Sequence, residues 1–120
     1  MEFTSSLTRN HEFRRLYSKG KNAASHCVVV YCAKNGKNEN CLGITVSSKL
    51  GNAVLRNRIR RRLKEIYRLN EHLLKTGYNI VMVARSGSRN AGWNDLGCSV
   101  LSLFRKLDLI SGDRLERKMI

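Results

Sequence analysis

The sequence predicts an α+β fold, a two-layer sandwich in which helices pack on a small sheet. Segments with apolar residues at helical spacing occur together with runs of β-branched or alternating residues, in the order helix, strands, helix, strand, helix. At 120 residues, the chain is long enough for one such core. It contains no internal repeat, no proline and no linker that would divide it. We therefore expect a single domain over residues 1–120, with its core at about 8–107 and a charged tail at 108–120.

A short helix is expected first, from about residue 10 to residue 18. Asn10 can cap its start, Gly20 stops it, and its apolar residues share one face. Residues 25–34 follow, and their central run of Val, Tyr and Cys favours a strand.

Turn formers at residues 35–38 separate this strand from the next. Residues 41–48 alternate between apolar and polar side chains, which is typical of a strand with one buried face. The apolar side holds Leu42, Ile44 and Val46, and the polar side holds Gly43, Thr45 and Ser47. We expect the two strands to pair as a hairpin.

A long basic helix is expected from about residue 52 to residue 74, ended by Thr76 and Gly77. Its apolar residues recur at intervals of four, four, three and seven, and so share one face: Leu55, Ile59, Leu63, Ile66 and Leu73. From Arg56 to Lys64, six of nine residues are basic. Like charges one turn apart destabilise a helix, and Arg matches phosphate oxygens with two donors. The segment therefore predicts a polyanion-binding surface rather than an ordinary solvated helix face.

The end of the chain supplies one more strand and one more helix. Residues 78–84 are almost continuously apolar, as expected for a strand that is buried on both faces. A flexible basic loop is expected at residues 86–92. The last helix is expected from about Asp95 to Lys106, with Asn94 available as its cap.

The charge of the whole chain also indicates a nucleic-acid partner. Lys and Arg number 23 against nine Asp and Glu, which gives a net charge of +14 and a pI of about 10.3. Such a balance favours nucleic acid over an anionic membrane surface. No apolar run approaches the roughly 20 residues of a membrane span, and the start of the chain lacks the features of a signal peptide. We expect a cytoplasmic protein.

Residue spacing indicates neither a metal site nor a catalytic site. The four cysteines form no C-x-x-C pair and the three histidines have no ligand spacing, so we expect reduced, packed thiols and no bound cofactor. Metal-dependent nucleases gather carboxylates around paired ions, whereas the few acids here are scattered. Nucleophile and nucleotide-binding motifs are missing as well. Composition and spacing alone therefore predict a nucleic-acid-binding module without catalytic residues of its own.

The basic segment resembles the signature of the protein subunit of bacterial ribonuclease P. The resemblance spans some 100 residues, in the family's order, over residues 9–20, 42–47, 48–65 and 78–85. Two departures are mild, because Tyr17 stands where Phe is common and Arg60 where Lys is common.

This resemblance implies a ribonuclease P protein-like fold with a small mixed sheet and a left-handed strand–helix–strand crossover. It also implies a role in the ribonuclease P holoenzyme, the endoribonuclease that removes the 5′ leader of precursor tRNA. The RNA subunit would carry the catalysis and use magnesium. The implied partners are that catalytic RNA, with one protein per RNA, and precursor tRNA.

The resemblance also implies two sets of RNA-binding residues. The set that faces the catalytic RNA is Lys49, Arg56, Asn57, Arg58, Arg60 and Arg61. A central cleft for the leader would be formed by Phe13, Tyr17 and Tyr31. Judged from spacing alone, rings of this kind more often belong to a hydrophobic core. Stacking on aromatic rings is, however, how single-stranded RNA is held without reading its sequence.

Two other functions remain as alternatives. A ribosomal or other structural RNA-binding protein would have the same charge, but it would associate stably with ribosomes. A nuclease that acts without RNA would need at least three carboxylates that converge in the folded chain.

Overall fold

Strands from both halves of the chain form one mixed sheet in the computed structural model, which describes residues 4–111. The strands are β1 (Thr4–Ser6), β2 (Lys21–Ala24), β3 (Val28–Lys34), β4 (Asn40–Thr45) and β5 (Tyr78–Ala84). Their order across the sheet is β1-β4-β5-β3-β2. β4 is parallel to both β1 and β5, whereas β3 is antiparallel to β5 and to β2. The predicted α+β class is confirmed.

The predicted hairpin is wrong, because β5 lies between β3 and β4. The turn itself forms: Gly36 has a φ of +73°, and the backbone N–H of Lys37 donates to Asn35 Oδ1 at 2.8 Å. Turn residues reverse the chain, but they do not decide whether the flanking strands pair. β5 is apolar on both faces and gains most from the central position. The connection between β3 and β4 therefore spans two strand spacings, about 9.5 Å.

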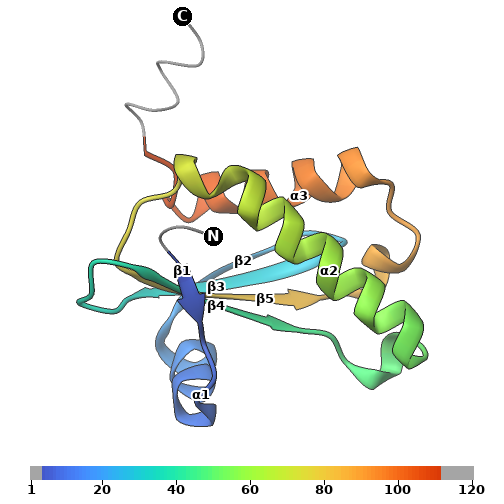
Figure 1. Cartoon of the computed structure of the whole chain (residues 1–120), viewed down its shortest axis with the longest axis horizontal. Coiled ribbons are helices and arrows are strands. Elements are labelled where there is room, and N and C mark those ends of the chain that lie inside the picture. Colours follow the sequence, from blue (N-terminus) through green and yellow to red (C-terminus); the bar gives the residue numbers. More distant parts are fainter. Residues whose placement is uncertain (1–3, 112–120) are drawn as a thin grey trace, which may run out of the picture.

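Helices cover the two faces of the sheet unequally (Figure 1). α1 (Asn10–Lys19) lies alone on one face, while α2 (Ala53–Asn70) and α3 (Trp93–Lys106) lie together on the other. α1 packs mainly on β3 and β5. One helix cannot cover a whole sheet face, so side chains on the α1 side of β3 and β4 remain accessible.

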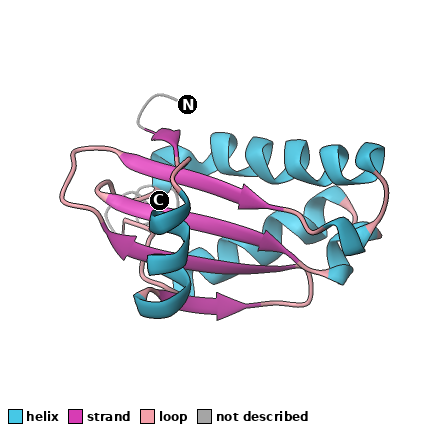
Figure 2. Cartoon of the chain, turned by 90° about the horizontal axis from the view of Figure 1, so that it is seen from below, coloured by secondary structure: helices cyan, strands magenta, loops and turns pink. Residues whose placement is uncertain are grey.

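β4, α2 and β5 form a parallel crossover of unusual hand. Seen from the α1 side, β4 and β5 run in the same direction and α2 returns behind the sheet (Figure 2). This arrangement makes the connection left-handed, against a preference for right-handed crossovers that holds in about 98% of cases. The left-handed crossover implied by the resemblance is therefore present.

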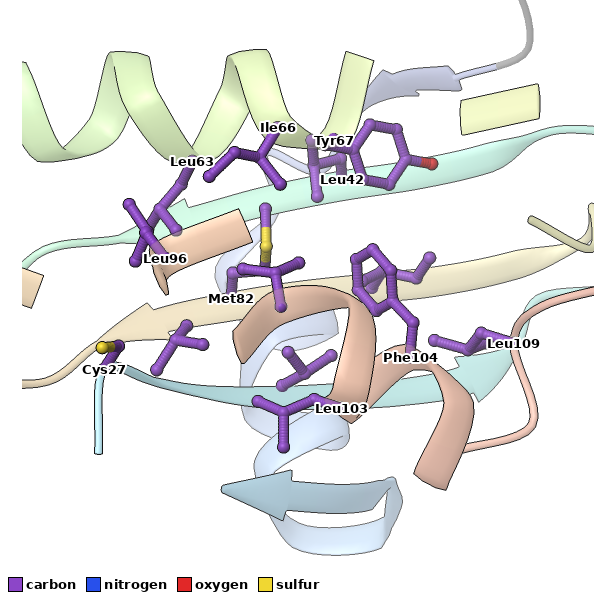
Figure 3. Close-up of a cluster of buried hydrophobic side chains, with 14 of the residues drawn as sticks. Cys27, Leu42, Leu63, Ile66, Tyr67, Met82, Leu96, Leu103, Phe104 and Leu109 are labelled. Atoms are coloured by element: carbon purple, nitrogen blue, oxygen red, sulfur yellow. The ribbon is translucent and has the colours of Figure 1, made fainter. Parts of the chain in front are cut away.

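The main hydrophobic core lies between the sheet and the helices α2 and α3 (Figure 3). Side chains from α2 and α3 meet the inner face of β3, β4 and β5 there, and the largest are Ile59, Leu63, Ile66, Tyr67, Leu96, Leu103 and Phe104. The rings of Tyr67 and Phe104 meet edge to face at 6.3 Å between centroids. This packing fixes the buried face of α2 and leaves its basic face outside.

A buried polar contact fixes the start of β4 against α2 and β5. The Asn40 amide donates to the carbonyl oxygen of Lys75 at 3.0 Å and to Tyr67 Oη at 3.3 Å, and it accepts from the backbone N–H of Tyr78 at 2.9 Å. Burial raises the pKa of the Tyr67 hydroxyl, so that it stays protonated in the core. Asn40 thereby ties β4 to α2 and β5.

The ends of the helices differ from the predicted ones in three places. Arg9 rather than Asn10 precedes the first turn of α1, and Gly92 rather than Asn94 precedes α3; neither gives a side-chain cap. In both cases the first helical residue lies before the first residue of the apolar pattern from which the helix was predicted. α2 ends at Asn70 and continues as a 3₁₀ turn at Glu71–Leu73, which brings Leu73 and Leu74 into the core.

Sequence patterns missed the two edge strands, β1 and β2. Both are short and poor in β-branched residues, and β2 presents an exposed Lys21 as edge strands often do. The chain after α3 also contributes to the core, since Leu109 and Ile110 are buried and Ile110 pairs with Leu74. The rest of the predicted tail, residues 112–120, lies outside the described residues.

The four thiols differ in accessibility, which predicts a simple labelling result. Cys27, Cys32 and Cys41 are buried and Cys98 is exposed, and none forms a disulfide. Burial also raises the pKa of the Cys32 thiol. We expect iodoacetamide to modify only Cys98 in the native protein and all the cysteines after denaturation, as counted by intact mass. Native labelling of Cys32 at a rate similar to Cys98 would contradict the packing of β3.

Candidate nucleic-acid interface

The basic helix α2 begins with a well-formed cap and buries only its apolar side. Asn52 Oδ1 accepts from the backbone N–H of Leu55 at 2.9 Å, and this bond satisfies one of the free donors of the first turn. Ile59, Leu63 and Ile66 are buried, and Leu55 packs against the same core. The predicted apolar face is confirmed.

The opposite side of α2 carries the predicted RNA-facing residues. Asn57, Arg58, Arg60 and Arg61 are exposed, and so is Lys49 in the 3₁₀ turn at Ser48–Leu50 that leads into the helix. Asn57 Oδ1 accepts from Arg60 Nη1 at 3.1 Å and so orients that guanidinium. The structure thus brings these five side chains to the first half of one helix and the turn before it.

Almost none of this positive charge is neutralised within residues 4–111. The ion pairs there are Arg68 with Glu65 and Lys75 with Asp108. The hydrogen bond from Arg68 lowers the pKa of the Glu65 carboxyl, so this pair persists at neutral pH. Glu65 therefore balances the second half of α2, and the unpaired cations are concentrated in its first half.

Arg56 and Arg62 are half-buried and differ from the exposed cations. Arg62 Nη2 donates to the carbonyl oxygen of Ala91 at 3.0 Å and braces the loop before α3. Arg56 Nε is buried and has no hydrogen-bond partner among the described residues. The exposed ring of Trp93 shares a shallow hollow with Arg58, Arg61 and Arg62. Sequence patterns gave no reason to place this ring beside α2.

The second candidate set, Phe13, Tyr17 and Tyr31, forms an aromatic cluster on the opposite face of the sheet. The Tyr17 ring lies 4.9 Å from Tyr31 in an edge-on arrangement and 6.4 Å from Phe13, measured between centroids. Tyr17 is 41% exposed, while Phe13 and Tyr31 are half-buried. Their inner edges pack against Leu16 and Val81. The cluster is therefore neither a sealed core nor a freely exposed surface.

β4 contributes two small residues that let this cluster form. A Cβ atom on Gly43 would lie 2.6 Å from Phe13 Cζ, so glycine is what allows the ring to rest on the sheet. Thr45 Oγ1 lies 3.4 Å from Tyr17 Oη, a long hydrogen bond that restrains the ring weakly. The alternating sequence pattern placed both residues on the polar side of a strand, and that orientation is confirmed. The pattern gave no reason to connect Gly43 with Phe13.

No metal-binding arrangement occurs in the described part of the chain: no group of three or more His, Cys, Asp or Glu side chains converges there. No helix within residues 4–111 is long and apolar enough to cross a membrane. What the two candidate sets offer chemically is phosphate binding through guanidinium groups and base stacking on rings.

Comparison with known proteins gives matches over nearly the whole chain. A family model described as Ribonuclease P matches residues 1–108. The ribonuclease P protein component of Alkaliphilus metalliredigens is 39% identical over 111 residues, which cover 92% of this chain and 100% of that protein. The corresponding protein of Clostridioides difficile is 40% identical over 107 residues, which cover 88% and 94% of the two chains.

Solved structures agree with these sequence matches. The RNase P protein of Staphylococcus aureus superposes with a TM-score of 0.81 at 30% identity, covering 88% of this chain and 97% of that one. The RNase P protein of Thermotoga maritima superposes with a TM-score of 0.77 at 28% identity, covering 90% and 99%. The five-stranded sheet with its three helices is therefore similar to the fold of those proteins.

Proposed function

The chain belongs to the ribonuclease P protein family, and from that premise we propose that α2 binds the catalytic RNA while the aromatic cluster holds the 5′ leader of the substrate. As the protein component of ribonuclease P, it assists the RNA subunit in the 5′ processing of precursor tRNA. Family membership also removes the reason to consider a ribosomal protein, which charge alone allowed.

The observation that carries the proposal for α2 is the position of its unpaired cations. They occupy the first half of the helix, where the helix dipole is positive and cations are unfavourable. No acidic residue lies in the first turn. Arg56 adds a buried donor without a partner among the described residues, at a cost of about 1–3 kcal/mol. Phosphate groups of the catalytic RNA would relieve the first of these costs, and they could reach Arg56 Nε only if that side chain turned outward.

Three features support the aromatic cluster as the leader site. Its rings come from α1 and β3 and converge on a sheet face that α1 covers only in part. Tyr17 keeps an exposed ring surface on which a base can stack. The weak bond between Tyr17 and Thr45 allows that ring to move aside and expose Tyr31. Stacking of this kind tolerates any leader sequence.

The remaining parts of the proposal concern the holoenzyme. We propose one protein per catalytic RNA, precursor tRNA as the substrate, and the cytoplasm as the location. Magnesium would be used by the RNA subunit, where it would activate the attacking water and stabilise the leaving oxygen. The protein would supply cations that lower the repulsion between RNA phosphates.

Replacing Arg60 and Arg61 with Ala tests the role of α2. Both side chains are exposed, Arg61 opposite the buried Ile59 and Arg60 on the flank of the helix, so the melting temperature should stay nearly unchanged. Binding to the catalytic RNA should weaken, and the slope of log K against log salt should fall by about 0.7–0.9 for each phosphate that the variant no longer neutralises. Titration at several salt concentrations measures this slope.

Arg105→Ala with Lys106→Ala on α3 is the matched control. It removes the same charge from the exposed end of another helix and should leave the slope unchanged. Equal slopes for the α2 variant and the parent protein would show that a different surface contacts the catalytic RNA.

A further inference from the structure

A basic groove lies on the side of α1 that faces away from the aromatic cluster. We define it by five cations that line two adjoining hollows of about 430 and 270 Å³: Arg15, Lys19, Lys21, Lys34 and Lys37. The two hollows share the walls formed by Lys19 and Lys34. None of the RNA-facing residues of α2 and none of the three rings belongs to this groove.

α1 separates the groove from the aromatic cluster. At about 100° per residue, Arg15 and Lys19 lie on one side of the buried Leu16, and Phe13 and Tyr17 lie on the other. The same division occurs on β3, where Ala33 lines the groove while Tyr31 belongs to the cluster. These residues are two apart on one face of the strand, about 6–7 Å. The two surfaces are therefore neighbours across a single helix.

The positive charge of the groove is only partly balanced by its own acids. None of its five cations makes an ion pair within residues 4–111. Its acids are Glu12, and Asp108, which is paired with Lys75. Like charges gathered in a concave surface repel one another unless an anion lies between them. The groove thus has the electrostatics of a phosphate-binding site.

The lining of the groove indicates which part of a nucleic acid would bind. Rings are few along the groove: His11 lines the larger hollow and Tyr78 the smaller one, so bases have less surface to stack on than in the aromatic cluster, while cations predominate. A row of Lys and Arg beside an aromatic platform is how proteins follow a single strand, with cations on the backbone and rings on the bases. Here Arg14, exposed on the outer side of α1, adds a cation between the two surfaces.

We propose that the basic groove is a second binding site for single-stranded RNA, which takes the sugar–phosphate backbone of the distal, 5′-terminal part of the leader. This inference rests on the proposed function, because it has the leader cross α1 from the aromatic cluster. It assigns a task to cations that the contact with the catalytic RNA does not use. It also predicts that the protein improves substrate binding more for long leaders than for short ones.

The test compares holoenzymes that carry Lys34→Gln and Lys37→Gln with the parent enzyme. Affinity is measured for two precursor tRNAs that differ only in their leaders, of roughly 5 and roughly 15 nucleotides, which bracket typical single-strand site sizes. We expect the variant holoenzyme to bind the long-leader substrate on the order of 10-fold more weakly at about 0.1 M salt. The slope of log K against log salt should fall by about 1.4, or about 0.7 for each of the two lost phosphate contacts. Binding of the short-leader substrate should not change.

A second variant tests the other wall of the groove, and a third serves as the control. Arg15→Gln with Lys19→Gln changes that wall and should give the same dependence on leader length. Arg105→Gln with Lys106→Gln removes equal charge from α3, on the far side of the sheet, and should change neither affinity. Melting curves establish that each variant is folded.

Either of two results would overturn the inference. Unchanged long-leader affinity in both groove variants would show that the groove does not bind RNA. Equal losses for both leaders would assign it to the catalytic RNA or to the tRNA body. If instead the aromatic cluster did not bind the leader, the result would be different: Tyr31→Ala would leave the affinity for the short-leader substrate unchanged.

Discussion

The purified protein alone is expected to leave precursor tRNA uncleaved, and addition of a bacterial ribonuclease P RNA is expected to restore accurate 5′ processing. Phosphodiester hydrolysis by a metal-dependent nuclease requires carboxylates around the ions, and no such cluster exists among residues 4–111. The protein offers cations instead, with a net charge of +14. Since these cations replace metal counterions, the gain in rate should be largest at low magnesium. Gel analysis of the cleaved leader, at several magnesium concentrations, measures this gain in cleavage rate.

The control for this experiment is the Arg60→Ala, Arg61→Ala variant. At low magnesium it should restore less cleavage than the parent protein, and saturating magnesium should reduce the difference, because metal ions can then neutralise the RNA without the protein. Magnesium-dependent processing by a preparation shown to be free of RNA would contradict the prediction and revive a protein-based nuclease.

Periodicity predicted the helices and the inner strands of the fold but not their arrangement. The apolar face of α2 and the two-sided burial of β5 follow from side-chain spacing, which is local information. The order of the strands depends on which strand gains most from the centre of the sheet. β5 took that place and separated β3 from β4, although the turn between them has good hairpin chemistry. The left-handed crossover was accessible only through the family resemblance.

The candidate site shows the same division between local and long-range information. The cations of α2 could be identified from the sequence, because a run of Arg needs no tertiary structure to be noticed. The fit of Phe13 over Gly43 and the bracing of Ala91 by Arg62 depend on residues that are far apart in the chain. The basic groove had a partial signal, since Arg15 and Lys19 lie one turn apart on one helix. Its other cations join them only when β3 folds beneath α1.

Tyr31→Ala is expected to lower the affinity of the holoenzyme for precursor tRNA by about 1–3 kcal/mol, the scale of one base stack. Tyr31 is half-buried beneath α1 and in edge contact with Tyr17, so its ring could also serve only to pack α1 on the sheet. Tyr17→Ala is the companion variant. Because Tyr17 is 41% exposed, its removal should cost little stability while it removes a stacking surface.

Mature tRNA separates the leader contact from every other effect, because it carries no leader. If the rings stack on leader bases, both variants should bind mature tRNA as the parent holoenzyme does and should lose affinity only for the precursor. If Tyr31 were a core residue, its truncation would cost about 3–5 kcal/mol of stability. The melting temperature would then fall by more than about 10 °C. Such a fall in Tyr31→Ala, with equal losses of affinity for precursor and mature tRNA, would remove Tyr31 from the site. If Tyr17→Ala lost affinity only for the precursor, the leader would still be placed on the exposed part of the cluster.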